Sequence, residues 1–227
     1  VLALGAVQNA DAQNWAVKSN LLYDATTSIN LGFETALAEK WTFDMSGNWN
    51  PFQFSNNKKW KHWFVQPEVR YWTCRKFGGH FFAGHLWGGQ YNVGNVGFIP
   101  DFLGTPFSQL KDHRYEGWFA GAHFGLGYYN YALDGDYRYQ DHNRETPSLG
   151  GGLAFGYRTH LSKNKRWKLE FALGGGVYSV DYDKFHNTPV TEDGLMVASS
   201  VKKTYWGIDQ AAVSFSYSFD LKKKGGT

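Results

Sequence analysis

The stretch Trp41-Thr-Phe-Asp-Met-Ser-Gly-Asn-Trp-Asn50 has large apolar residues at positions 41, 43, 45 and 49 and mostly polar residues between them. In an α-helix these apolar side chains would spread around the whole circumference, whereas in a β-strand they share one face. The stretch therefore predicts a β-strand with one apolar and one polar face.

The same period of two recurs along most of the chain. It is clear in 63–71, 167–173 and 213–219, and weaker near 15–24, 28–38, 79–92, 115–133 and 147–161. Most of these segments are long enough for a tilted strand to cross a bilayer, which takes about 9–11 residues. No apolar stripe with a 3.6-residue period persists, so we expect an all-β fold.

The composition is typical of a membrane β-barrel. Of the 227 residues, 19% are aromatic and 27 are glycine, and the mean hydropathy is -0.48. No uncharged apolar run reaches the about 18 residues that a spanning helix needs, while barrels carry aromatic belts at both membrane interfaces. The length predicts a single domain. The net charge of +3 is too small to indicate a nucleic-acid partner.

The cost of exposed backbone groups decides which face meets lipid. In hydrocarbon a sheet must close and turn its apolar face outward. We therefore expect a closed antiparallel transmembrane β-barrel of 8 or 10 strands, with short periplasmic turns and longer extracellular loops. A soluble sandwich or lipocalin-like barrel with its apolar face inward is the alternative. The gathering of Trp and Tyr at strand ends and of small polar residues on the other face argues against it.

The outward face supplies two predicted sets of residues. The lipid-facing set is Val65, Val69, Phe171, Val213 and Phe215. The aromatic girdle at the strand ends is Trp41, Trp49, Trp63, Tyr71, Tyr205 and Phe219.

Counting the strands leaves their number open. The connections at 38–40, 73–79 and 162–165 are short, and those at 51–60, 93–113, 134–146 and 183–203 are longer and polar. Nine candidate strands result, but a barrel with both termini in the periplasm needs an even number. Either 115–133 forms two strands, giving ten, or it joins an extended extracellular hairpin on an eight-stranded barrel.

Both ends of the chain indicate export. Val1-Leu-Ala-Leu-Gly-Ala-Val7 resembles the end of a signal peptide's apolar region, and Ala10-Asp-Ala12 has the small-x-small pattern of a cleavage site. A simple N-terminal tail is the alternative. We expect a signal-peptide remnant at 1–12, the barrel at 13–221 and a polar tail at 222–227. The alternating aromatics of 214–221 resemble the signal that the outer-membrane assembly machinery recognises, so the predicted location is the outer membrane of a Gram-negative bacterium.

Several strings resemble an uncharacterised family of predicted outer-membrane proteins of Bacteroides and relatives, classified as a domain of unknown function. They are Ser19-Asn-Leu-Leu-Tyr-Asp-Ala25, Trp60-Lys-His-Trp63, Val65-Gln-Pro-Glu-Val-Arg-Tyr-Trp72, Gly79-His-Phe-Phe82, Gly89-Gln-Tyr-Asn-Val-Gly94, Arg114-Tyr-Glu-Gly-Trp118 and Asp181-Tyr-Asp-Lys184. The resemblance covers nearly the whole mature chain, except for an extra strand and loop between 129 and 150. It implies the fold and location but no catalytic residues. Some relatives are encoded beside fimbrial genes, which allows an adhesion or assembly role.

Charged residues on the polar phase form the best-defined candidate site. The predicted lumen charge network consists of Lys18, Glu34, Asp44, Glu68, Arg70, Arg158, Lys168 and Glu170. A narrow barrel cannot leave buried charges unpaired, and both signs are present in similar number. We therefore expect ion pairs that fill the lumen, since eight strands leave room for side chains only. A gated or ion-selective pore is the alternative.

The sequence offers little evidence for catalysis or metal binding. His80 and His85 face opposite sides of one expected strand, and no histidine pair has zinc spacing. The neighbouring pairs at 112–113 and 141–142 lie in expected outer loops, where adjacent residues rarely form a working dyad. Cys74 has no cysteine partner. We expect no enzyme activity, no cofactor and no metal.

Three functions remain at this level. The first is a non-enzymatic structural or surface-interaction barrel, the second a narrow channel for small solutes, and the third a lipid-modifying enzyme. The expected partners are outer-membrane lipid and lipopolysaccharide, the assembly machinery at the C-terminal strand, and a surface or fimbrial protein. The Tyr- and Arg-rich loop at 134–144 has a composition that suits such a contact, or it is simply solvated.

Overall fold

The computed structural model describes residues 14–38, 40–54, 58–73, 115–133, 136–142, 147–187 and 195–220. These residues form nine β-strands and one short α-helix. In chain order the elements are β1 (Asn14–Asn20), α1 (Leu21–Ala25), β2 (Ile29–Ala38), β3 (Trp41–Asn50), β4 (Lys59–Trp72), β5 (Gly117–Ala132), β6 (Tyr137–Asp141), β7 (Ser148–His160), β8 (Trp167–His186) and β9 (Met196–Asp220). No helix in these ranges is long and apolar enough to cross a membrane.

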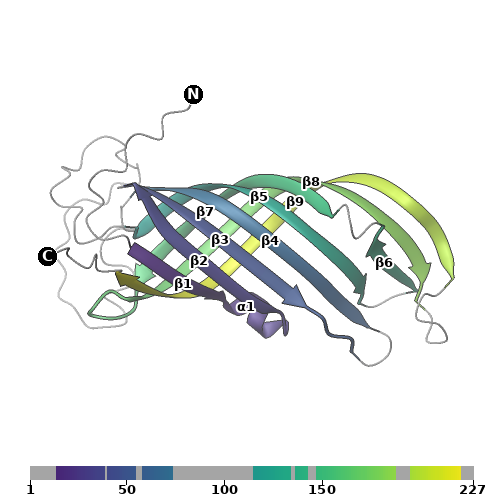
Figure 1. Cartoon of the computed structure of the whole chain (residues 1–227), viewed down its shortest axis with the longest axis horizontal. Coiled ribbons are helices and arrows are strands. Elements are labelled where there is room, and N and C mark those ends of the chain that lie inside the picture. Colours follow the sequence, from purple (N-terminus) through teal and green to yellow (C-terminus); the bar gives the residue numbers. More distant parts are fainter. Residues whose placement is uncertain are drawn as a thin grey trace, which may run out of the picture.

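The strands form one antiparallel sheet whose hydrogen bonds run in a ring (Figure 1). β1 pairs with β2 on one side and with β9 on the other. β2 pairs with β3, β3 with β4, and β4 with β5, and β8 pairs with β9. β6 and β7 both lie between β5 and β8. β7 pairs with residues 117–127 of β5, and β6 pairs farther along the same strand, at Asn130 and Tyr131. Within the described ranges the nine strands therefore occupy eight positions in the ring.

This arrangement explains the odd strand count of the sequence. β5 is a single strand of 16 residues, so 115–133 does not split into two. It pairs with β7 along 117–127 and with β6 at Asn130 and Tyr131. Two successive strands thus share one ring position, and the predicted loop at 134–146 contributes the first of them.

The connections differ in part from the expected alternation of short and long. The ring has a turn end, where the turns after β2 and β7 lie, and an opposite loop end, where the β3–β4 and β8–β9 connections lie (Figure 1). Because β4 pairs directly with β5, the chain leaves β4 and re-enters β5 at the turn end. The sequence predicted instead that the chain enters this strand at the loop end, after the long loop at 93–113. The expected strand at 79–92 and loop at 93–113 lie outside the described residues.

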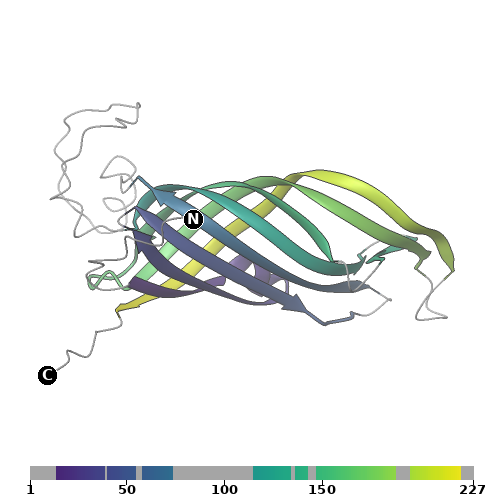
Figure 2. The same cartoon turned by 45° about the horizontal axis from the view of Figure 1, so that its top comes forward.

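β8 and β9 are the longest strands and continue past the ring at the loop end (Figure 2). β8 pairs there with β9 and with β6, whose residues 137–141 lie opposite 182–186. We call β6, residues 180–186 of β8 and residues 196–203 of β9 the extension. The region 183–203, predicted as a loop, is therefore largely strand.

A β-bulge in β9 changes which of its side chains face inward. Gln210 pairs with Gly174 and Ile208 with Gly175, so Asp209 is the extra residue. An extra residue shifts the two-residue alternation by one step. Tyr205 consequently lies opposite the buried Tyr178 on the inner face.

Apolar packing inside the ring is small. One cluster near the turn end joins Trp72, Tyr115 and Phe119 with Ala172. In the described ranges nine hydrophobic residues are buried, against 22 polar or charged ones, while 33 large hydrophobic residues are exposed. The fold therefore has a polar inside and an apolar outside.

Candidate functional site

All eight charged residues predicted for the lumen are buried inside the ring. They are Lys18 on β1, Glu34 on β2, Asp44 on β3, Glu68 and Arg70 on β4, Arg158 on β7, and Lys168 and Glu170 on β8. Strand alternation positions them, because each occupies the phase opposite to the exposed apolar residues of its own strand.

The strand register brings carboxylates together on one wall of the ring. Glu34 lies opposite Asp44, and Asp44 lies opposite Glu68. Like charges directly across neighbouring strands repel one another. This acidic wall therefore needs cations from other strands to be stable.

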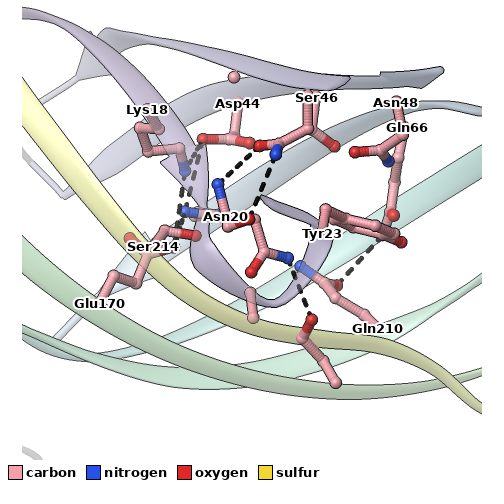
Figure 3. Close-up of a pocket in the computed structure, with 15 residues that line it drawn as sticks. Lys18, Asn20, Tyr23, Asp44, Ser46, Asn48, Gln66, Glu170, Gln210 and Ser214 are labelled. Carbon is pink, nitrogen blue, oxygen red and sulfur yellow. Dashed lines mark hydrogen bonds and ion pairs between the residues drawn. The ribbon is translucent and has the colours of Figure 1, made fainter. Parts of the chain in front are cut away.

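Three cations meet the acidic wall. Arg70 donates to Glu68 at 2.8 Å and to Glu170 at 2.9 Å, and it lies 3.5 Å from Asp44. Arg158 joins Glu34 to Glu170 across the interior. The Lys18 ammonium contacts Asp44 and lies 3.5 Å from Glu170, as Figure 3 shows.

The network rests on the aromatic cluster at the turn end. The Arg70 guanidinium lies 4.6 Å from the centre of the Phe119 ring, and that of Arg158 lies 4.4 Å from the Trp72 ring. Trp72 in turn donates to Thr42 at 2.8 Å. Such stacking holds both guanidinium groups in place and leaves their N–H groups free to bind carboxylates.

Lys168 differs from the other seven. It is buried on the inward phase of β8, yet it forms no ion pair in the described part of the chain. The remaining seven form one connected network. The cavity beside them has a volume of only about 40 Å³ and is lined by Lys18, Asp44 and Arg70 together with amide and hydroxyl side chains (Figure 3).

The inward histidine His123 has a partner that the sequence did not indicate. Its Nε2 lies 2.7 Å from Asp209 Oδ2. Two glycines leave room for this pair: a Cβ on Gly152 would lie 2.7 Å from His123 Nε2, and one on Gly176 would lie 2.1 Å from Asp209 Oδ2. The bulge that turns Asp209 inward could not be recognised from alternation.

His142, which was not expected to form a working dyad with its neighbour Asp141, pairs with Asp183 instead. His142 Nδ1 lies 2.7 Å from Asp183 Oδ1, and Ser199 donates to the same oxygen at 2.9 Å, whereas Asp141 accepts from Ser148. Burial raises the pKa of Asp183, but hydrogen bonds from the Ser200 N–H, His142 and Ser199 hold that pKa below its ordinary value. Ser199 contacts the carboxylate and not the imidazole, which is not the order of a Ser-His-Asp triad.

The residues predicted to face lipid lie on the outer face. Val69, Phe171 and Phe215 are exposed, and Val65 and Val213 are half-buried beside neighbours on the same face. Within the described ranges no three of His, Cys, Asp and Glu gather as metal ligands would.

The predicted aromatic girdle needs one correction. Trp41 contacts Tyr71 near the turn end, with ring centroids 5.1 Å apart, and Trp49 lies opposite Trp63 toward the loop end. Phe219 lies opposite Trp15. Tyr205, however, faces inward because of the bulge, and its hydroxyl donates to the Ile208 carbonyl at 2.9 Å.

Comparison with known proteins identifies the chain by family alone. No curated protein and no solved structure gives a significant match. One family model, described as a protein of unknown function (DUF3575), matches residues 1–139 and 123–219. These stretches include every described strand except for the last residue of β9, and they overlap in the region where β5 is followed by β6. The chain therefore belongs to the DUF3575 family.

Proposed function

We propose that this protein is a non-enzymatic outer-membrane β-barrel of a Gram-negative bacterium, with a structural or surface-interaction role. The proposal rests on the polar interior and apolar exterior of the ring, which reverse the arrangement of a soluble protein. In water, 33 exposed large hydrophobic side chains would be unfavourable on a domain that buries 22 polar residues. In a bilayer the same arrangement is favourable, because lipid covers the apolar face and the ring leaves few free backbone groups.

The strand dimensions support a membrane position. β2 and β3 have 10 residues each, within the about 9–11 that a tilted strand needs. Paired aromatic residues lie toward both ends of β3 and β4 on the outer face, where belts at the two lipid interfaces would form. We place lipopolysaccharide and phospholipid among the partners, with the assembly machinery meeting the aromatic C-terminal strand.

The charge network argues against the channel alternative. Seven charged side chains cross the interior from β1, β2, β3, β4, β7 and β8. The cavity beside them, at about 40 Å³, has room for roughly one water molecule. A hydrated ion would have to break several ion pairs to pass, so we propose a structural plug.

The extension supports a role in surface interaction. Residues 196–210 of β9 pair with β8 on one side and with no other strand in the described part of the chain. Such an edge can accept a strand from another protein through backbone hydrogen bonds. Lys202 and Lys203 are exposed along it, and lysines on an edge limit uncontrolled pairing. A surface or fimbrial protein is the proposed partner class.

Two measurements test the proposal. The mature chain should fractionate with the outer membrane and migrate faster on gels without heating than after boiling, as closed barrels do. In planar bilayers it should show no stable single-channel conductance. A soluble periplasmic pool without a heat shift would refute the membrane barrel, and a steady conductance would refute the plug in favour of a narrow channel.

A further inference from the structure

We propose that a second cavity, toward the loop end, is a binding site for a short neutral saccharide. Its volume is about 710 Å³, within the range of small-molecule sites. It adjoins the small cavity beside the charge network, with which it shares Tyr23, Gln210 and Ala211. Residues from α1, β4, β5, β7, β8 and β9 line it. The proposal does not require that the ring span a membrane.

One wall of this cavity is a stack of aromatic rings. Tyr131 stacks on Trp60, with centroids 4.7 Å apart, and on Tyr129, with centroids 5.5 Å apart. Phe64 and Tyr178 add a second ring pair with centroids 6.0 Å apart. Aromatic faces carry negative charge density. The C–H groups on the face of a sugar ring are weakly positive, so they pack well against such rings.

Unpartnered polar groups distinguish the cavity from a purely apolar pocket. His62 is 6% exposed and Tyr178 is 7% exposed. Within the described residues neither nitrogen of His62, nor the Tyr178 hydroxyl, nor Trp60 Nε1 has a hydrogen-bond partner, and Asp209 Oδ1 is also unpaired. Each such buried group is unfavourable while it stays unsatisfied. A small rotation of these shielded side chains toward the cavity would let a ligand with several hydroxyl groups satisfy both the donors and the acceptor.

The charges around the cavity exclude other ligand classes. Among the described residues that line it there is no Lys or Arg, whereas Lys18 and Arg70 line the smaller cavity. An anionic ligand would therefore meet Asp209 without a countercharge beyond His123. An acyl chain would leave the donors of His62, Tyr178 and Trp60 unpaired. A quaternary ammonium would suit the rings, but it offers these donors no acceptor. A neutral polyhydroxylated ring fits both features.

The first experiment measures binding to the full chain in a detergent without a sugar headgroup. The probes are glucose, galactose, mannose, N-acetylglucosamine and their di- and trisaccharides. Tryptophan fluorescence and calorimetry measure their binding. We expect saturable binding of at least one of them. The absence of saturation by every sugar, with a protein that keeps its β-sheet circular dichroism, would overturn the proposal.

Variants then locate the site. Tyr131→Ala and His62→Ala should each weaken binding about tenfold or more, which is about 1.4 kcal/mol, while Tyr131→Phe keeps the ring and should bind nearly as well as the native chain. Trp118→Phe, on the outer face of β5, is the matched control and should have no effect. Equal affinity in His62→Ala and the native chain would overturn the proposal even if Tyr131→Ala failed to fold. Saturable binding of tetramethylammonium with the same dependence on Tyr131 would overturn it in favour of a cation site.

Discussion

At the scale of single residues, Arg70 contacts more carboxylates than any other cation of the interior in the described part of the chain. It lies within 4.0 Å of Glu68, Glu170, Asp44 and Glu34. We expect Arg70→Ala to lower the free energy of unfolding by about 3–5 kcal/mol, because it leaves buried carboxylates without a partner. Urea unfolding in lipid vesicles measures this, and planar-bilayer recordings show whether the opened interior conducts.

The control for this change is Arg166→Ala. Arg166 is exposed in the turn before β8, where it donates to the Tyr217 hydroxyl at 3.2 Å. Its replacement should cost about 0.5 kcal/mol or less, as surface changes usually do. If both variants lose the same stability and neither conducts, the ion-pair network is not a stabilising plug.

Gly152 tests how closely β7, β8 and the interior pack. A Cβ at this position would lie 2.4 Å from the Gly175 carbonyl oxygen, which is backbone and cannot rotate away. Gly152→Ala should therefore destabilise the protein by about 1–3 kcal/mol. Gly47→Ala is the matched control: its nearest neighbour would be 4.0 Å away, so we expect no loss. Thermal unfolding of both variants measures the difference in stability. An unchanged stability of Gly152→Ala would contradict the close packing.

The charged residues could be predicted individually, but their partners could not. Alternation identified Lys18, Asp44 and Glu170 as inward residues because the two-residue period holds throughout the part of the ring nearer the turn end. The contact of Arg158 with Glu34 joins residues 124 positions apart, and alternation says nothing about which walls face each other. Asp209 was missed because one extra residue in β9 reverses its phase.

At the scale of elements, alternation predicts best where a strand is regular and borders the apolar outer face. The segments predicted at 28–38, 41–50 and 147–161 agree within one residue per end with β2, β3 and β7. The end of β8 and the start of β9, which lie within 183–203, were predicted as a loop, because polar residues and register shifts interrupt their pattern. β6 has five residues, too few to establish a period.

The orientation of β9 gives a test that separates a membrane barrel from a soluble one. Val213 lies opposite Phe171 on the outer face, and its neighbour Ser214 lies opposite Glu170 on the inner face. We expect Val213→Arg to cost about 2–4 kcal/mol if it lies near the bilayer midplane, falling for outward positions closer to the interfaces. Ser214→Arg should show no such dependence on depth and should respond to local room and to Glu170.

Urea unfolding in vesicles of the two arginine variants provides the comparison. Additional outward positions, Val65 and Phe215, supply the depth series. A large penalty at Ser214 with none at Val213, Val65 or Phe215 would mean that the strand meets water on its outer face. The protein would then be a soluble barrel, and the membrane proposal would fail.

At the scale of the whole molecule, the two ends of the ring should lie on opposite sides of the membrane. An epitope inserted at 188–194, between β8 and β9, should be reached by antibody on intact cells. The same epitope at 163–164, in the turn between β7 and β8, should be reached only after permeabilisation. Labelling of the turn alone on intact cells would show that the orientation is inverted, and equal labelling of both would contradict a spanning ring.

Pairing between β1 and β9 is the step that closes the ring. Asn14 pairs with Asp220 and Asn20 with Ser214, so this ladder joins residues about 200 positions apart. Contacts so distant in sequence form slowly, since a long chain must be ordered before they contribute. Until β9 pairs with both of them, β1 and β8 present open edges. The chain is therefore most vulnerable to aggregation before the 25-residue β9 closes the ring, and escort by other proteins matters most in that interval.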